Sequence, residues 1–225
     1  MKEYRRICAN ISLKALEHNL DAIHDCIDRD TKIIAVVKAD GYGHGAVPLA
    51  EVMEQREDVW GYAVATPEEA EELYSNGIKK PILILGYTFP EYDEQIVKEG
   101  LRPAVFSLER AKQLSEEAVR QNKECKIHIK LDTGMSRIGF KSDEESVDAT
   151  VQGIVMINSL LKNIRIDGIF THFACADCED DHMTFKQLKR FDNVIDRLEK
   201  NGVHIPIKHW ANSAAIIKYP GMRMN

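Results

Sequence analysis

Residues 33–37 are Ile-Ile-Ala-Val-Val and residues 82–85 are Ile-Leu-Ile-Leu, two short apolar runs with no polar residue among them. Strands that are covered on both faces, as in a parallel sheet, have this pattern. Similar segments recur along the chain and are separated by stretches with helical spacing. We predict strands at residues 32–39, 60–65, 81–85, 102–106, 126–131, 165–171 and 207–210, after an initial strand near residues 5–11.

Helix-capping signals lie between the predicted strands. Thr66-Pro67-Glu68-Glu69 combines an N-cap, a proline at the first helical position and a capping-box glutamate, and Gly77 is placed to end that helix. Ser142 and Glu145 repeat the capping box and predict a helix that runs to about residue 161. The chain therefore alternates strands with helices along its length.

This alternation predicts right-handed βα units in a parallel sheet. Seven units after the initial strand, with no Gly/Pro/Ser-rich linker between them, fit a (β/α)8 TIM-type barrel. A doubly wound open sheet is the weaker alternative, because it typically has about five or six strands. We predict one α/β domain over residues 1–225, a barrel that stops before its last strand. Such a barrel would leave two strand edges unpaired, which suggests a truncated chain.

The composition limits the class of protein. A net charge of −6, with no run of Lys or Arg longer than two residues, argues against a nucleic-acid partner. No segment approaches the roughly 18 apolar residues of a membrane span, and no apolar stretch follows the basic start as in a secretory signal. The five cysteines are an odd number and are scattered, so they do not indicate a disulfide framework. We expect a cytoplasmic protein without a membrane partner.

Catalytic residues of a parallel barrel lie where the strands end and in the loops that follow. The first predicted strand ends at Lys38, and Ala39-Asp40-Gly41-Tyr42-Gly43-His44-Gly45 follows it. A lysine at the end of an apolar strand loses hydration, which favours the neutral, nucleophilic amine. The glycines allow positive φ and close approach to a ligand. From spacing alone, a surface lysine before a flexible turn remains an alternative, and the dinucleotide fingerprint G-x-G-x-x-G is absent.

Later strand ends carry further candidates. Lys130, Asp132 and Arg137 surround the end of the fifth strand, where an ion-pair network that braces the barrel mouth is an alternative to a ligand site. His172 ends the sixth strand, a position at which many histidines are simply buried in the core. Asn212-Ser213 follows the seventh strand and is typical of a helix N-cap, with Ser213 as a capping hydroxyl. The free N–H groups and the dipole of a helix N-terminus also favour a phosphate.

Residues 35–45, Ala-Val-Val-Lys-Ala-Asp-Gly-Tyr-Gly-His-Gly, resemble the cofactor-lysine motif of alanine racemases almost residue for residue. The resemblance implies that Lys38 holds pyridoxal 5′-phosphate (PLP) as a Schiff base and that Tyr42 reaches the cofactor phosphate. It also implies that Arg137 hydrogen-bonds the phenolic oxygen of PLP and the region of the substrate carboxylate. The lysine that matches Lys130 is carbamylated in some members of the family and orients that arginine.

The same resemblance implies that His172 lies beneath the PLP ring in a supporting role, and that Ser213, next to Asn212, binds the phosphate. Cys175-Ala176-Asp177-Cys178 departs from the family pattern, because only the Ala-Asp pair follows it. With His182 nearby, these cysteines give three candidate ligands, which leaves tetrahedral zinc incomplete. We therefore predict no metal site.

Members of this family continue with a last barrel strand of the type N-M-V-R-x-G and then a β-rich domain. That domain carries a catalytic tyrosine that acts from the partner subunit of a homodimer. The resemblance implies that the intact protein interconverts L- and D-alanine for peptidoglycan synthesis, with Lys38 as one of two bases. We expect the 225-residue chain to lack the second base and to be inactive or nearly so.

Two alternatives remain open. One is a serine or broad-specificity racemase of the same fold, because residues that select the substrate lie partly in the expected second domain. The other is a non-catalytic PLP-binding barrel protein, which would end after a complete eighth strand. The stretch at residues 132–139, Asp-Thr-Gly-Met-Ser-Arg-Ile-Gly, resembles the racemases rather than that second group.

Overall fold

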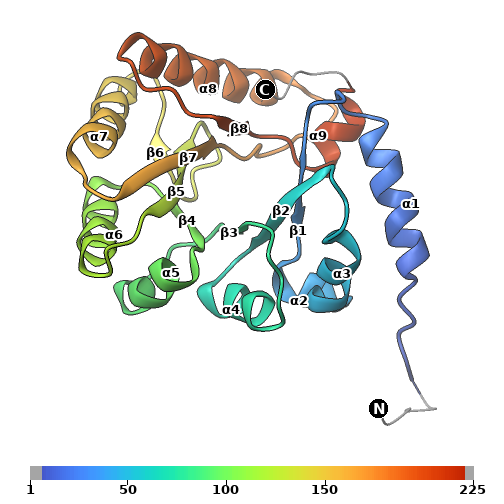
Figure 1. Ribbon diagram of the computed structural model, residues 1–225. Helices are drawn as coiled ribbons and strands as arrows, with labels where there is room; N and C mark the ends of the chain where they lie inside the picture. The colour runs from blue at the N-terminus through green and yellow to red at the C-terminus, as the bar shows by residue number, and fades with distance from the viewer. Residues whose placement is uncertain (1–6, 221–225) are drawn as a thin grey trace.

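The computed structural model describes residues 7–220, in which a ring of parallel strands is surrounded by helices (Figure 1). Within those residues the main strands follow one path, β1-β2-β3-β4-β5-β7-β8, and each neighbouring pair is parallel. Their bounds are β1 (Ile33–Val36), β2 (Val59–Val64), β3 (Ile82–Ile84), β4 (Arg102–Val105), β5 (Cys125–Asp132), β7 (Ile164–Phe170) and β8 (Ile207–His209). The predicted barrel is confirmed, and in this part of the chain its sheet is open between β8 and β1.

The helices cover the outside of the ring (Figure 1). They are α1 (Leu13–His24), α2 (Lys38–Gly43), α3 (Ala46–Met53), α4 (Pro67–Ser75), the short 3₁₀ helix η1 (Pro90–Tyr92), α5 (Asp93–Glu99), α6 (Leu108–Arg120), α7 (Val147–Leu160), α8 (His182–Lys200) and α9 (Ser213–Lys218). The consecutive side chains Ile82, Leu83 and Ile84 of β3, which point alternately to the two faces of the sheet, are all buried. Consecutive strands therefore pack on both faces, as their unbroken apolar sequences predict.

The start of the chain differs from the prediction. Residues 7–11 form no strand, whereas residues 5 and 6 of the predicted initial strand lie outside the described residues. The first regular element is α1, whose N-cap Ser12 accepts the Ala15 N–H at 3.2 Å. Ile7 and Ile11 are exposed there, so the apolar pattern of this segment is not matched by burial within residues 7–220.

The segment after β5 also differs. A short strand, β6 (Phe140–Lys141), lies parallel to the end of β5 and pairs Lys141 with Asp132. The predicted capping box at Ser142 is wrong, because the Ser142 hydroxyl donates to the Phe140 carbonyl at 3.0 Å and α7 begins only at Val147. The chain is still engaged with β5 at the position where the pattern suggested a helix start, so tertiary pairing overrides the local signal.

His128 lies inside the ring with none of its surface exposed. Its Nδ1 is 3.0 Å from Nε2 of His209 on β8, and its ring is tilted against Trp60. Gly168 on the neighbouring strand makes room for it, because a Cβ atom there would lie 2.5 Å from the imidazole. Burial, together with the nearby charge of Arg102, lowers the pKa of His128 to about 3.

This burial predicts acid-sensitive stability. The unfolded chain binds a proton at His128 below about pH 6.5, whereas the folded protein does not until about pH 3. Folding stability should therefore fall as the pH drops below 6.5, by about 2–3 kcal/mol from this group at pH 4.5. We expect the His128→Gln variant to lose less stability than the wild type between pH 7 and pH 4.5, measured by urea unfolding. Exposed His204 gives the control, His204→Gln, and equal pH slopes for all three proteins would refute the prediction.

Candidate functional site

The predicted site residues follow the carboxyl ends of four strands. Lys38 comes after β1, Arg137 after β5, His172 after β7, and Asn212-Ser213 after β8. Because all these strands are parallel, their carboxyl ends open on one side of the ring. The structure thus brings the candidates to one mouth of the barrel, and the contacts among them show how closely each approaches the others.

Lys38 lies between the end of β1 and a turn of left-handed helix. Val37 is buried and donates its N–H to the Ala63 carbonyl of β2 at 2.9 Å, which fixes the strand end. The residues that follow, 39–42, all have φ between 51° and 60°, so α2 is a turn of left-handed helix. For an L-residue other than glycine this conformation costs roughly 1–2 kcal/mol. The surrounding structure must therefore hold Ala39, Asp40 and Tyr42 in place.

Specific contacts stabilise the left-handed turn. Gly41 is buried, and a Cβ atom there would lie 2.8 Å from Cδ1 of Leu49, so close packing as well as its positive φ requires glycine. The carboxylate of Asp40 accepts the Ala46 N–H at 2.8 Å and joins the turn to α3. The turn places the Tyr42 ring next to Lys38, with 5.8 Å between Nζ and the ring centroid, and leaves Tyr42 61% exposed.

Glu69 adds a contact that the sequence did not reveal. Thr66 Oγ1 accepts the Glu69 N–H at 3.4 Å, and Gly77 has a φ of +87°, so the predicted cap and end of α4 are confirmed. The Glu69 carboxylate, however, accepts the N–H groups of Ala39 at 2.8 Å and Ala65 at 2.6 Å. Nothing local signals this bond, because Ala39 and Glu69 are 30 residues apart.

The charges of three basic side chains reach His172. Its pKa is lowered first by burial and then by the charges of Lys130, Arg137 and Lys38, so all three side chains lie within electrostatic reach of its ring. Lys130 is 4% exposed, and burial lowers its pKa to about 8. Its Nζ donates to the Leu131 carbonyl at 2.9 Å and lies 5.0 Å from the centroid of the Phe170 ring. The mouth is thus a positively charged site, suited to a ligand with several anionic groups.

The alternative of an ion-pair network at this mouth is wrong. The Asp132 carboxylate accepts the N–H groups of Gly134 at 3.1 Å and Ser136 at 2.9 Å. No direct ion pair within residues 7–220 joins it to Lys130 or Arg137, although its charge partly offsets the lowering of the Lys130 pKa. Its task is to shape the loop after β5. Arg137 stays exposed on that loop, where its guanidinium is available to a ligand.

Gln187 is a second residue that sequence reasoning missed. It is fully buried on α8, and its Nε2 donates to Thr133 Oγ1 at 3.1 Å and to the His172 carbonyl at 3.0 Å. Its Oε1 accepts the Ala174 N–H at 2.9 Å. One amide therefore ties the loop after β5 to the loop after β7 and fixes the backbone of His172. A buried polar residue of this kind cannot be distinguished from an exposed one by helical spacing alone.

The residues after β8 begin a helix, but the capping residue is not the predicted Ser213. Asn212, not Ser213, is the N-cap of α9, and its Oδ1 accepts the Ala215 N–H at 2.9 Å. Ser213 is the exposed first residue of that helix. Among the contacts described for residues 7–220, none joins Asn212 or Ser213 to Lys38. Their participation in the site therefore stays a prediction.

The two cysteines near His172 form a turn in which Cys178 donates its N–H to the Cys175 carbonyl at 3.1 Å. Among residues 7–220, no three His, Cys, Asp or Glu side chains gather in a group that could hold a metal ion. In the same part of the chain, no helix is both long enough and apolar enough to cross a membrane.

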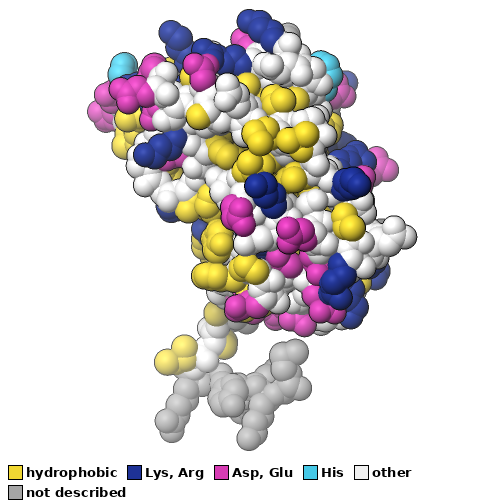
Figure 2. All heavy atoms as spheres, turned by 90° about the vertical axis from the view of Figure 1, so that its left-hand side faces the viewer, with side chains coloured by type: hydrophobic (Ala, Val, Ile, Leu, Met, Phe, Trp, Pro, Cys, Tyr) yellow, Lys and Arg dark blue, Asp and Glu magenta, His cyan; other side chains and the backbone are white. Residues whose placement is uncertain are grey.

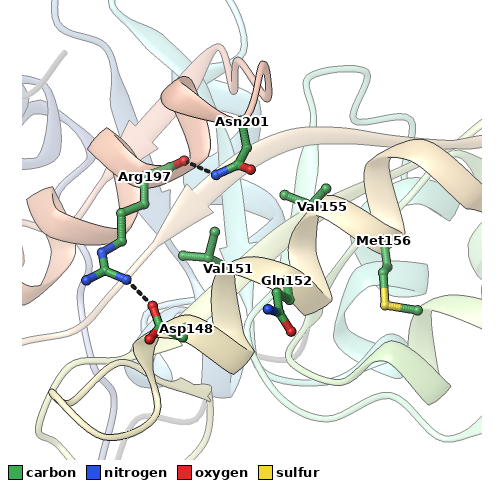
Figure 3. A pocket seen from close by; sticks show the side chains of 7 residues that line it. All are labelled: Asp148, Val151, Gln152, Val155, Met156, Arg197 and Asn201. Atoms are coloured by element: carbon green, nitrogen blue, oxygen red, sulfur yellow. Dashed lines mark hydrogen bonds and ion pairs between the residues drawn. The ribbon is translucent and has the colours of Figure 1, made fainter.

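The outer surface offers a groove of a different kind, between α7 and α8 (Figure 3). Its polar contacts are the Asp148–Arg197 ion pair and the hydrogen bond from Asn201 Nδ2 to the Arg197 carbonyl at 2.8 Å. Figure 2 shows the side that faces left in Figure 1, where apolar side chains lie among charged ones. The groove is lined by residues of α7 and of the end of α8 and contains no primary amine, so the barrel mouth is the better candidate.

Comparisons with known proteins show the family to which the chain belongs. The family model described as "Alanine racemase, N-terminal domain" matches residues 11–225. The chain belongs to the alanine racemase family. It is 44% identical to the alanine racemase of Clostridium tetani over 99% of this chain and 56% of that protein. It is 41% identical to that of Methanococcus maripaludis over 97% of this chain and 57% of that protein.

Solved structures of the family show the same fold. An alanine racemase of Clostridium difficile 630 superposes with a TM-score of 0.87 at 43% identity, over 92% of this chain and 53% of that one. A structure of that enzyme in complex with cycloserine gives a TM-score of 0.89 over 95% of this chain and 57% of that one. The chain therefore spans about half the length of the relatives that it matches.

Proposed function

We propose that this chain is the cofactor-binding barrel of a PLP-dependent alanine racemase, with Lys38 as the residue that holds the cofactor. The observation that carries the proposal is the placement of Lys38, Arg137 and His172 after the carboxyl ends of parallel strands, with the Tyr42 ring 5.8 Å from Lys38 Nζ. Membership of the alanine racemase family supports the same assignment.

The chemistry of the donor set fits PLP. The cofactor combines an aldehyde, which needs a primary amine, with a phosphate and a phenolic oxygen, which need cations and hydrogen-bond donors. Lys38 supplies the amine, and Tyr42, whose ring lies beside it, is exposed and supplies a hydroxyl. Arg137 presents a fork of N–H donors for oxygen groups. The N-terminal N–H groups of α9, next to Asn212 and Ser213, suit the phosphate.

PLP supplies an electron-withdrawing ring that stabilises the carbanion left when an amino acid loses its α-proton. The Lys38 amine would hold the cofactor, and its Nζ, when free, would move the α-proton on one face of the substrate. Arg137 orients the substrate carboxylate by charge-assisted hydrogen bonds. Burial lowers the pKa of His172, which favours its neutral form near pH 7, so it would lie beneath the ring without adding a positive charge.

Racemisation needs a second proton-transferring group on the opposite face of the substrate. We propose that a tyrosine from the partner subunit of a homodimer supplies it, and that the whole protein makes D-alanine for peptidoglycan in the cytoplasm. The test is the formation of D-alanine from L-alanine by the whole protein with added PLP, with L-serine as the competing substrate. A whole protein that racemises neither amino acid contradicts the proposal. Racemisation by residues 1–225 alone at the rate of the whole protein contradicts the assignment of the second base.

Lys130 gives a separate prediction. Only a neutral amine attacks CO2, forming an N–C bond and releasing a proton, and a pKa of about 8 leaves a useful neutral fraction of Lys130 near pH 8. We expect a carbamate at Lys130, whose negative charge would orient Arg137. Carbon-labelled bicarbonate should give a carbamate signal in the NMR spectrum of the wild type. Lys130→Gln should abolish that signal, whereas the neighbouring control Lys126→Gln should keep it, and any other pattern refutes the assignment.

A further inference from the structure

Glu69, in the first turn of α4, uses both oxygens of its carboxylate to join two backbone segments. Its Oε1 accepts the Ala39 N–H and its Oε2 accepts the Ala65 N–H, at 2.8 and 2.6 Å. In an ordinary capping box the carboxylate would instead accept the N–H of the N-cap residue, here Thr66. Glu69 thus links the loop after β1 to the loop after β2, which is more than the capping of its own helix requires.

The backbone of Lys38 is held on both sides by these contacts. On one side Val37 donates to the Ala63 carbonyl of β2 at 2.9 Å, and on the other side Ala39 donates to Glu69 at 2.8 Å. The positions of Val37 and of the Lys38–Ala39 peptide group determine where the Lys38 side chain starts and in which direction it leaves the backbone. Loss of the Glu69 contact would free one of the two.

The left-handed turn makes this second anchor important. Ala39 is the first of five consecutive residues with positive φ, 39–43, and only two of those, Gly41 and Gly43, are glycines. Released from its hydrogen bond, Ala39 would gain free energy by returning to negative φ. The residues after it would then swing, and the Tyr42 ring would leave its place beside Lys38.

We propose that Glu69 is a positioning residue for Lys38, which holds the left-handed turn so that the amine meets the cofactor aldehyde. Glu69 itself touches neither cofactor nor substrate. The inference rests on the proposed function, because it requires that Lys38 forms the covalent bond to PLP.

The Glu69→Gln variant tests the inference with little change in shape. An amide has one oxygen and one NH2 group, so it can accept only one of the two backbone N–H groups and presents a donor to the other. The matched control is Glu72→Gln on the same helix, because Glu72 is exposed and its carboxylate makes none of the hydrogen bonds described for residues 7–220. Each purified protein is incubated with limiting PLP, reduced with borohydride, and mapped by peptide mass spectrometry.

We expect Glu69→Gln to lower the PLP trapped at Lys38 about tenfold, the factor associated with one hydrogen bond to a charged group. Near-UV circular dichroism and a cooperative thermal transition should show that the variant remains folded. Glu72→Gln should trap PLP like the wild type. A folded Glu69→Gln protein that traps PLP at the wild-type level overturns the inference.

A second variant separates positioning from a general loss of stability. Glycine adopts positive φ without the steric cost of alanine, so Ala39→Gly in the Glu69→Gln background should restore most of the trapping at Lys38. A folded double variant that stays at the level of Glu69→Gln overturns the inference. If Glu69→Gln does not fold, amide hydrogen exchange on the wild type decides instead. Slow exchange of the Ala39 N–H supports the anchor, and exchange at the rate of a free amide overturns it.

Failure of the proposed function gives a different result. If the wild type traps no PLP at Lys38, the assignment of the cofactor lysine is wrong and the role of Glu69 falls with it. If the wild type traps PLP at Lys38 and Glu69→Gln traps as much, only the positioning role is refuted.

Discussion

Replacement of Lys38 by arginine should abolish the covalent attachment of PLP. Arginine keeps the positive charge and much of the length of the side chain, but its guanidinium does not form the borohydride-reducible bond that a primary amine forms with an aldehyde. Peptide mapping after reduction should find PLP on Lys38 in the wild type and only background labelling in Lys38→Arg. The effect is the largest that we expect on cofactor chemistry, because it removes the reacting atom.

The control is Lys32→Arg, at the other end of the same strand. Lys32 lies just before β1, and its Nζ donates to the Glu57 carbonyl at 2.9 Å. This variant should retain full labelling at Lys38. Labelling of the Lys38→Arg protein at Lys130 to the wild-type level would show that the anchor had been assigned to the wrong strand end.

Removal of the Arg110 guanidinium should give the largest loss of stability. Arg110 on α6 is 3% exposed, and its NH1 donates to the Asp93 carboxylate at 2.7 Å, while its Nε and NH2 donate to Thr88 Oγ1 at 3.3 and 3.1 Å. In Arg110→Met the carboxylate of Asp93 stays buried without its cation. Breaking a buried pair from one side in this way costs about 3–5 kcal/mol, which urea or thermal unfolding would measure.

An exposed pair on the same protein is the matched control. Arg197 and Asp148 line the groove of Figure 3, and their side chains are 39% and 79% exposed. Arg197→Met should cost less than about 1 kcal/mol, because water and salt screen the pair. The double variant Arg110→Met/Asp93→Leu should recover part of the loss, since it leaves no buried charge. Equal losses for Arg110→Met and Arg197→Met would refute the role of burial.

The barrel could be predicted because its determinants are local. The unbroken apolar run at residues 33–37 and the capped helix that begins after Thr66 each carry their own signal, and their alternation implies the parallel ring. β6 and the late start of α7 could not be predicted in this way. Both depend on the pairing of Lys141 with Asp132, which only the folded chain brings together.

The candidate site, too, could be predicted only where its determinants are local in the sequence. Lys38, Arg137 and His172 could be placed at strand ends, and the chain motif around Lys38 indicated the cofactor. The hand of the turn after Lys38 could not be predicted, because Ala39 and Asp40 adopt positive φ only with help from elsewhere. That help comes from Glu69, and the support for His172 comes from Gln187, each far away in sequence.

Within residues 7–220, β8 and β1 are the two unpaired edges of the sheet, and an opening lies between them. Lys38 follows one rim strand and Asn212 follows the other, so in residues 7–220 the path of strands that links them runs the long way round the sheet. Side chains of both rims, among them Ile33 and His209, line a cavity of about 230 Å³ at the opening. A cofactor bonded to Lys38 and held at the start of α9 would connect the two edges of the sheet across the opening. Cofactor binding would then raise the free energy of unfolding of the protein.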